Sequence, residues 1–488
     1  MRILQVSAEI FPLLKTGGLA DIAGALPAAL HEVGCDVRLL LPGFPAILAG
    51  LSVAVVVGTF AMPWGQSIEV QFGEFAALST SAHKQFGYVL VAPSLFDRSG
   101  NPYEDANKQP YGDNHRRFAA LGWAAAHLAH GLDDHWRPQL VHAHDWHAAL
   151  APACLAFWHD TYAPKVPSVY TVHNLAYQGI FGPHEFADLG LPSAAYNLNG
   201  MEFHGNVSFM KAGLYYASHI TTVSPTYARE IQTSEQGCGL DGLLMSRAHQ
   251  LSGILNAVDD GVWNPETDAL IAHTFSVRNM SGKAHNKALL QRTMHLHEDA
   301  DAPLFTVVSR LVEQKGLPLV LSAIDEILSC GGQLLILGSG DAALEQAFVA
   351  KSQEFPGRIS VRLGYDESFA HAIFAGSDIT LVPSRFEPCG LTQMYGLKYG
   401  SLPLVRRVGG LADTVTDTDL ETMDDRTACG FVFDRLEPLD YRKAIRRAVA
   451  LYKRKPDWNR VRQTGMRIAF DWGSAAGQYK SLYQRLIA

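Results

Sequence analysis

Short apolar runs that stop at Gly, Ser, Asp or Asn recur along the whole chain and alternate with longer amphipathic stretches. Runs of four to eight bulky residues bounded by turn residues are typical of strands buried on both faces of a sheet. The stretches between them have helical spacing and end at glycine, as residues 20–34 do. Such alternation predicts parallel sheets with right-handed crossovers. The expected strands are residues 3–9, 36–43, 139–145, 167–174, 219–225, 252–258, 304–310, 333–341, 359–365, 378–384 and 402–407.

The length of 488 residues exceeds what one hydrophobic core supports, so we expect two doubly wound α/β domains. One strand series ends at residues 219–225 and another begins at 252–258, which places the boundary near residue 250. The predicted division is residues 1–250, residues 251–466 and a terminal helix over residues 467–488. The apolar residues of that helix lie on one face: Tyr479, Leu482, Tyr483 and Leu486.

The formal charge of −8 comes without any run of five or six Lys or Arg. This argues against nucleic acid or an anionic membrane as the main partner and suits a neutral polymer such as a polysaccharide. The six cysteines have no CxxC spacing, so we expect reduced thiols. Polar residues interrupt the first apolar stretch, which reads as a strand and not as a signal peptide. With no stretch of 18 apolar residues, we expect no membrane span and a cytoplasmic location.

Ligands of open α/β sheets bind beyond the carboxyl ends of the strands. Those ends carry the unusual polar residues of this chain, and they come from both halves of it. We therefore expect two domains that face each other across a cleft. The segments concerned are residues 15–21, 142–147, 173–174, 256, 310–315 and 384–390.

The first loop, KTGGLADIAG at residues 15–24, combines paired glycines with the start of a helix. Glycines allow backbone N–H groups to approach a ligand, and a helix N-terminus favours an anion. Lys15 adds a positive charge. The spacing matches neither a P-loop nor GxGxxG, so an anion site and an ordinary turn both remain open.

Arg310 and Lys315 follow another expected strand, in SRLVEQKGL. Two cations at a strand end can clamp a diphosphate, Arg as a fork and Lys as a point charge. Solvated surface charge is the alternative.

In VHAHDWH, residues 141–147, His142 and His144 alternate along a strand and can share one face. With His147 or Asp145 they could form a metal site, but neither an HExxH motif nor a cysteine ligand accompanies them. Hydrogen-bonded structural histidines are the alternative that we favour. Asp145 remains a candidate for binding a sugar or fixing a cation.

The segment SRFEPCGLTQMYGLKYG, residues 384–400, runs from a strand into a helix that Gly390 opens. The amides of Leu391 and Thr392 could hold a phosphate, and Glu387 could accept sugar hydroxyls. Helix capping by Glu387 and a small buried thiol at Cys389 explain the same residues equally well.

Together these segments resemble the bacterial glycogen synthase and plant starch synthase family. The resemblance extends in order along nearly the whole chain, and KTGGLAD and EPCGLTQ are its most specific parts. The matching segments are KTGGLADIAGALP, HAHDWH, TVHN, SFMKAGLYYA, SRLVEQKG, SRFEPCGLTQMYGLKYG and RRVGGLADTV.

The resemblance implies the GT-B fold: two Rossmann-like, doubly wound domains facing across a deep cleft, with the donor on the C-terminal side, the acceptor on the N-terminal side and the terminal helix packing back on the N-terminal domain. It implies transfer of glucose from ADP-glucose to the non-reducing end of an α-1,4-glucan, with retention and with neither a cofactor nor a metal. Nucleic acid and membrane are not among the implied partners.

Carried over by resemblance, the site residues form three groups. Lys15, Gly18, Arg310 and Lys315 would clamp the diphosphate, with the loop Cys389, Gly390, Leu391 and Thr392. Glu387 would hold donor-sugar hydroxyls, while Asp145, His173 and Asn256 would lie at the donor sugar or reaction centre, and Tyr365 would stack on adenine. The catalytic residues among these would be Glu387, Asp145, His173, Arg310 and Lys315.

One departure from the family pattern concerns residues 256–259, which read Asn-Ala-Val-Asp where the family usually has Asn-Gly-Ile-Asp. Replacing glycine removes its freedom to adopt positive φ at that turn.

Three other functions remain as alternatives: a UDP-glucose-dependent transferase of the same fold, a pyridoxal-dependent glucan phosphorylase and a catalytically silent glucan-binding scaffold.

Overall fold

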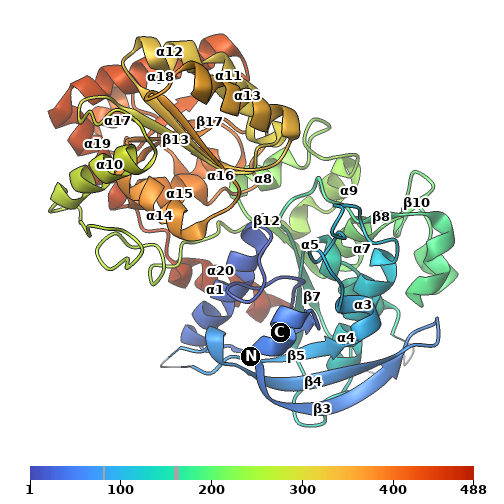
Figure 1. Ribbon diagram of the computed structural model, residues 1–488. Helices are drawn as coiled ribbons and strands as arrows, with labels where there is room; N and C mark the ends of the chain where they lie inside the picture. Colours follow the sequence, from blue (N-terminus) through green and yellow to red (C-terminus); the bar gives the residue numbers. More distant parts are fainter. Residues whose placement is uncertain (81–82, 159–163) are drawn as a thin grey trace. The chain divides into compact units, whose positions relative to one another are not determined.

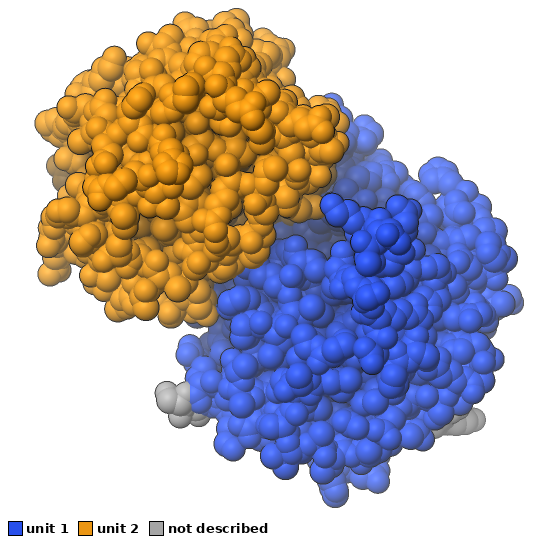
Figure 2. Space-filling model, viewed as in Figure 1, with its two compact units in different colours: residues 1–256, 472–488 blue, residues 257–471 orange. Residues whose placement is uncertain are grey.

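The computed structural model describes residues 1–80, 83–158 and 164–488, and it divides into two compact units (Figures 1 and 2). Unit 1 comprises Met1–Asn256 together with Trp472–Ala488, and unit 2 comprises Ala257–Asp471. The divisions lie a few residues after positions 250 and 466, where the sequence placed them. Among the described residues, no helix combines the length and apolar character needed to cross a bilayer.

Unit 1 is built on a nine-stranded sheet in the order β12-β11-β7-β6-β1-β2-β5-β4-β3. Seven of these strands pair in parallel, as their buried apolar runs predict. The parallel strands are β1 (Arg2–Val6), β2 (Asp36–Pro42), β5 (Phe86–Val91), β6 (Leu140–His144), β7 (Ser168–Val172), β11 (His219–Thr222) and β12 (Leu251–Gly253).

The other edge of this sheet departs from the all-parallel expectation. The strands β3 (Leu51–Ala61) and β4 (Ser67–Phe75) form an antiparallel hairpin, and β4 pairs antiparallel with β5. The connection between β3 and β4 is only residues 62–66, too short for a parallel crossover. A small separate sheet contains β8 (Ile180–Phe181), β10 (Asn206–Ser208) and β9 (Glu202–Phe203).

A second difference concerns residues 252–258, which were expected to open the second domain. The strand β12 instead extends the sheet of unit 1, with Leu251 opposite Ile220 of β11. Ile254 is buried in a cluster with residues of the first and last helices of that unit, so burial keeps this segment in unit 1.

The helices of unit 1 cover its sheet, and the last of them comes from the end of the chain. They are α1 (Gly18–Glu32), α2 (Pro45–Gly50), α3 (Pro93–Phe96), α4 (Asn114–Ala129), α5 (Asp145–Ala148), α6 (Leu150–Ala156), α7 (Phe209–Tyr216), α8 (Pro225–Glu230), α9 (Asp241–Ser246) and α20 (Trp472–Ile487). Figure 1 shows α20, in red, beside α1, in blue; Leu26 and Leu30 of α1 share a buried cluster with Tyr479 and Leu482 of α20.

Helix α1 contains Pro27, and the sheet compensates for it. Proline has no N–H, so the carbonyl of Ala23 one turn earlier loses its helical donor. The side chain of Gln5, on β1, donates from Nε2 to that carbonyl at 3.0 Å. Gln5, the polar residue in the buried part of this strand, therefore satisfies a buried backbone group.

Unit 2 contains a six-stranded parallel sheet in the order β15-β14-β13-β16-β17-β18. Its strands are β13 (Leu304–Val308), β14 (Gln333–Gly338), β15 (Ile359–Leu363), β16 (Ile379–Val382), β17 (Leu402–Arg406) and β18 (Phe431–Phe433). Its helices are α10 (Ser281–Thr293), α11 (Leu317–Ser322), α12 (Ile324–Ser329), α13 (Ala342–Glu354), α14 (Glu367–Gly376), α15 (Thr392–Lys398), α16 (Gly409–Thr414), α17 (Leu420–Asp424), α18 (Pro438–Lys453) and α19 (Lys455–Met466).

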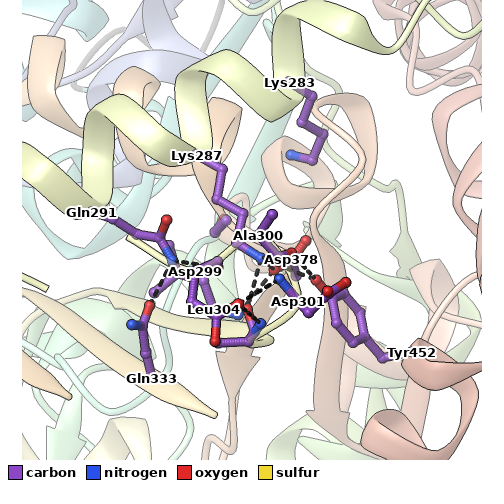
Figure 3. Close-up of polar contacts among 12 residues, drawn as sticks. Lys283, Lys287, Gln291, Asp299, Ala300, Asp301, Leu304, Gln333, Asp378 and Tyr452 are labelled. Carbon is purple, nitrogen blue, oxygen red and sulfur yellow. Dashed lines mark hydrogen bonds and ion pairs between the residues drawn. The ribbon is translucent and has the colours of Figure 1, made fainter. Parts of the chain in front are cut away.

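A buried polar cluster fastens α10 to the amino ends of β13 and β16 (Figure 3). Lys287 Nζ lies 2.8 Å from Asp378 Oδ2 and donates to the carbonyls of Ala300 and Ala302 and to the Tyr452 hydroxyl. Asp378 also accepts from the backbone N–H of Leu304. Because all these groups have partners and lie opposite the strand ends that bind ligands, we assign them to stability.

Candidate active site

In unit 1 the strands β1, β6 and β7 are neighbours, so the residues that follow them lie at one edge of the sheet. Lys15 and Gly18 come after β1, Asp145 after β6 and His173 after β7. The sheet therefore brings together four of the five site residues predicted in this unit. The fifth, Asn256, lies beyond β12 at the far end of the sheet order and is buried.

The loop after β1 is held by Glu9, which the sequence analysis missed. The buried carboxylate of Glu9 accepts hydrogen bonds from the backbone N–H of Thr16 at 2.5 Å, from its hydroxyl at 2.6 Å and from the hydroxyl of Tyr103. Lys15 lies in this loop and forms an ion pair, at 2.9 Å, with Asp21 in the first turn of α1. The only sequence signal for Glu9 was a charge within the first apolar stretch.

Asp145 occupies the junction between β6 and α5 and has a backbone φ of 60°. A left-handed backbone at a residue other than glycine is uncommon and clusters at functional sites. The side chain is buried, and its Oδ1 accepts from the N–H of Trp146 at 2.8 Å. Burial raises the pKa of Asp145 to about 7; the N–H of Trp146 opposes this rise, and the negative charge of Glu9 adds to it.

The histidines of residues 141–147 form a hydrogen-bonded group. His142 lies 2.8 Å from the hydroxyl of Tyr483 in α20 and 2.6 Å from that of Thr171 in β7. His144 Nδ1 lies 3.0 Å from His173 Nε2. Within the described part of the chain, no three His, Cys, Asp or Glu side chains are grouped so that they could hold a metal ion. The hydrogen bonds of His142 and His144 therefore match the interpretation of these residues as hydrogen-bonded structural histidines.

In unit 2 the residues after the neighbouring strands β13 and β16 meet. Lys315 Nζ lies 2.6 Å from Glu387 Oε2, and the Ser384 hydroxyl donates to the same oxygen at 2.9 Å. Glu387 is 6% exposed, whereas Arg310 of the same loop as Lys315 is exposed, with its Nη2 3.3 Å from Gln314 Oε1. The predicted cations and the predicted carboxylate thus gather at one edge.

Two glycines keep the loop that carries Glu387 in place, and no local pattern in the sequence predicts this contact. A Cβ on Gly409 would lie 1.9 Å from the carbonyl oxygen of Glu387, and one on Gly410 would lie 2.1 Å from that of Cys389. Gly410 N–H also donates to the Glu387 carbonyl. Gly409 is also the first residue of α16, so this helix begins directly against the loop of the candidate site.

Four of the remaining predicted residues of unit 2 follow Glu387 in the same loop, and the fifth, Tyr365, lies after a different strand. Gly390 has a φ of 73°, Leu391 is the N-cap of α15 and Thr392 is its first residue. Cys389 is buried, as the interpretation of this residue as a small buried thiol predicted. Tyr365 follows β15, which β14 separates from β13, and it is 66% exposed.

The replacement of glycine by Ala257 causes no backbone conflict, because Ala257 is not among the residues with positive φ. The turn is held instead by Asp259, which accepts from the N–H of Gly261 at 2.8 Å, and by the bond from Val258 N–H to the carbonyl of Phe470.

Known proteins share both halves of this architecture. A model of the starch synthase catalytic domain matches residues 2–246, and a model of group 1 glycosyl transferases matches residues 295–462. The catalytic domain of starch synthase IV from Arabidopsis thaliana, solved bound to ADP and acarbose, has a TM-score of 0.88 at 32% identity, over 100% of this chain and 99% of that one. A sucrose-phosphate synthase from Thermosynechococcus elongatus, at 18% identity and a TM-score of 0.61 over 99% and 98% of the two chains, shares the fold. The fold and strand-end sites thus define a glycosyltransferase of the GT-B class.

Curated relatives narrow the class further. The chain is 62% identical to a glycogen synthase of Variovorax paradoxus (strain S110), over 100% of this chain and 99% of the relative. It is 56% identical to a glycogen synthase of Leptothrix cholodnii, with both chains covered completely. The chain belongs to the glycogen synthase and starch synthase family, which confirms the resemblance and the fold class expected from the sequence.

Proposed function

We propose that the protein transfers glucose from ADP-glucose to the non-reducing end of an α-1,4-glucan, with retention of configuration, in the cytoplasm and without a metal or other cofactor. The observation that carries the proposal is the pair of Lys315 and Glu387 at adjacent strand ends, beside Arg310. The names of the full-length relatives and the ADP and acarbose bound to the Arabidopsis starch synthase support the choice of substrates.

Arg310 and Lys315 would act on the departing diphosphate. As the glycosidic bond breaks, the leaving ADP gains negative charge, so both cations stabilise the transition state more than the ground state. The amides near Leu391 and Thr392 would contact the same phosphates, and Tyr365, with most of its side chain exposed, would stack on adenine.

Glu387 would accept hydrogen bonds from donor-sugar hydroxyls. Its charge also suits a glucosyl centre that becomes oxocarbenium-like in the transition state. Asp145, His173 and Asn256 would line the donor sugar or reaction centre.

Two retaining routes are consistent with these residues. In a double displacement a carboxylate attacks the sugar, and in the other route the leaving phosphate assists attack on its own face. Burial raises the pKa of Asp145 to about 7, which leaves much of it protonated near neutral pH and weakens it as a nucleophile. The resemblance to the family favours the route through the leaving phosphate, and the raised pKa of Asp145 is consistent with it.

Initial rates with ADP-glucose and with UDP-glucose, both with glycogen as acceptor, test the donor. We expect a strong preference for ADP-glucose; a preference for UDP-glucose would defeat the ADP assignment, and no transfer from either donor would indicate a silent scaffold. A phosphorylase would instead depend on phosphate and show pyridoxal absorbance. Activity that survives exhaustive chelation supports the metal-free mechanism, and activity that is lost and then restored by a divalent ion contradicts it.

A further inference from the structure

His144, the last residue of β6, is a buried imidazole that the mechanism above does not use. Its side chain is fully buried, its Nδ1 lies 3.0 Å from Nε2 of His173, and its Nε2 has no hydrogen-bond partner among the residues that the structure describes. His173 itself is only partly buried and follows the neighbouring strand β7. One ring nitrogen of His144 thus contacts a candidate reaction-centre residue, and the other has no hydrogen-bond partner within the described residues.

Both rings are neutral near pH 7. Burial lowers the pKa of His144 well below its ordinary value and that of His173 to about 3, and the ring of His142, at 4.0 Å from His144 between centroids, adds repulsion to any charge on His144. A neutral imidazole carries one N–H and one bare nitrogen. The 3.0 Å contact therefore has one donor, which is either His144 or His173.

The two arrangements differ in what they leave at Nε2 of His144. If His173 donates, His144 must carry its own proton on Nε2, where a buried N–H would have no acceptor. If His144 donates from Nδ1, Nε2 is a bare nitrogen, and only an acceptor goes unused. Buried N–H groups without an acceptor are rarer in proteins than under-used acceptors, because the donor loses its hydration without any replacement. The second arrangement is therefore favoured.

We propose that His144 is a positioning residue that donates from Nδ1 to Nε2 of His173 and thereby holds the proton of His173 on Nδ1. His173 then presents a hydrogen-bond donor to its ligand and cannot act as a base. The assignment of the tautomer depends only on the surroundings of these two rings and not on the proposed function. That the ligand atom is an oxygen of the glucosyl substrate rests on the proposed function.

His142 supports this arrangement from the other side. Both of its nitrogens are bonded to hydroxyl groups, of Tyr483 and Thr171, so its ring is fixed beneath that of His144. Tyr483 is a suitable control position, because Tyr483→Phe removes a buried hydrogen bond of the same cluster without touching the bond between His144 and His173.

The direct test is nitrogen-15 NMR of the full-length protein labelled at histidine, with resonances assigned by single-histidine substitutions. The method distinguishes a ring nitrogen that carries a proton from a bare one. We expect the proton of His144 on Nδ1 and that of His173 on Nδ1. A proton found on Nε2 of His173 overturns the proposal, whatever the donor-sugar assay shows; conversely, failure to transfer glucose from ADP-glucose overturns the proposed function and leaves the tautomer assignment standing.

Two substitutions link the tautomer to turnover. In His144→Asn the amide can still donate to His173, whereas in His144→Leu the donor is lost and His173 can carry its proton on either nitrogen. We expect His144→Leu to give a mixture of His173 tautomers and about a tenfold lower kcat, the worth of one hydrogen bond, with KM for ADP-glucose changed much less. His144→Asn should retain both the tautomer and most of the kcat.

Tyr483→Phe should lower the thermal midpoint while the His173 tautomer and kcat stay as in the wild type. If kcat fell equally in His144→Leu, His144→Asn and Tyr483→Phe, the cluster would act only through stability and the positioning role would be wrong. The NMR spectrum of the wild-type protein tests the tautomer even where a variant fails to fold.

Discussion

The ammonium group of Lys315 and the carboxylate of Glu387 are 2.6 Å apart, although 72 residues separate them in the chain. Both side chains are largely shielded from water, with 19% and 8% of their surfaces exposed. Each therefore sets the electrostatic environment of the other, and a substitution at one changes the charge balance around the second.

Glu387→Gln should separate turnover from nucleotide binding. The amide can still accept from Ser384, but it lacks the charge that suits an electron-deficient glucosyl centre. We expect kcat to fall roughly ten- to a hundredfold, the range for a hydrogen bond to a charged group. The affinity for ADP, measured by calorimetry, should stay the same or increase, because Lys315 loses its counter-charge.

A suitable control for this substitution is Glu298→Gln, which removes a carboxylate from an exposed ion pair with Arg292. Glu298→Gln should leave both kcat and the affinity for ADP unchanged. A collapse of ADP affinity in Glu387→Gln alone would reassign Glu387 to holding the loop in shape.

Arg310→Ala and Lys315→Ala should each remove about 1.5–3 kcal/mol of transition-state binding, which is a ten- to hundredfold loss in kcat/KM. The reason is that the charge of the leaving diphosphate grows as the bond breaks. Initial-rate kinetics with ADP-glucose measure this loss. Arg292→Ala, on the exposed surface of α10, is the matched cation control. Near-wild-type rates in either site variant would refute the diphosphate clamp.

Gly409→Ala should damage the site through the backbone. The new Cβ would lie 1.9 Å from the Glu387 carbonyl, at a residue with a φ of 44°, so the loop or α16 must shift. We expect a lower thermal midpoint, with a cost of about 1–3 kcal/mol, and a reduced kcat.

Gly477→Ala provides the comparison for this substitution. Gly477 lies inside α20, where a Cβ meets no atom within 4 Å. Alanine is the better helix former by about 1 kcal/mol, so the thermal midpoint should rise and activity should not change. Equal effects of the two substitutions on kcat would show that the Gly409 contact does not position Glu387.

Asp145→Asn should lower the activity and raise the stability of the protein above neutral pH. The folded-state pKa of Asp145, about 7, lies above its ordinary value of 3.8, so between these values the folded protein retains a proton that the unfolded chain has lost. Stability from this group therefore falls as pH rises from about 4 to 7, and the penalty stays at its full size at higher pH. Asparagine avoids the penalty, keeps the acceptor for Trp146 and tolerates a positive φ.

Thermal melts of wild type and Asp145→Asn at pH 5 and pH 8 measure the effect. The variant should gain more over the wild type at pH 8 than at pH 5, by an amount on the order of 1–4 kcal/mol, while its turnover falls. An identical difference at both pH values would mean that Asp145 ionises normally in the folded protein.

Much of the architecture was predictable because it depends on local patterns. Each apolar run that was expected to form a strand does contain one, and the helix predicted over residues 20–34 matches α1, which ends two residues earlier at Glu32. The hairpin of β3 and β4 was missed because β3 is largely exposed and lacks the buried pattern of the other strands. Residues 252–256 were placed in the wrong domain because a strand of three residues does not indicate by itself which sheet it joins.

For the candidate site, the sequence predicted which residues lie at strand ends but not which of them touch. Lys315 and Glu387 were proposed for separate tasks, and only the adjacency of β13 and β16 shows that they pair. The contact between Glu9 and Tyr103, which helps to hold the loop after β1, could not be predicted for the same reason, since 94 residues separate the two in the chain. Contacts of this kind depend on tertiary packing, which local sequence patterns do not encode.

The position of α20 has a consequence for how this protein is made. Unit 2 is one continuous stretch of chain, and all of it leaves the ribosome before Trp472 does. Unit 1 is translated first, but the cluster around Leu26 and Leu30 of α1 is complete only after Tyr479 and Leu482 have followed unit 2 out of the ribosome. The nascent N-terminal unit therefore spends most of translation with an apolar face uncovered, a period in which chaperone binding should matter most.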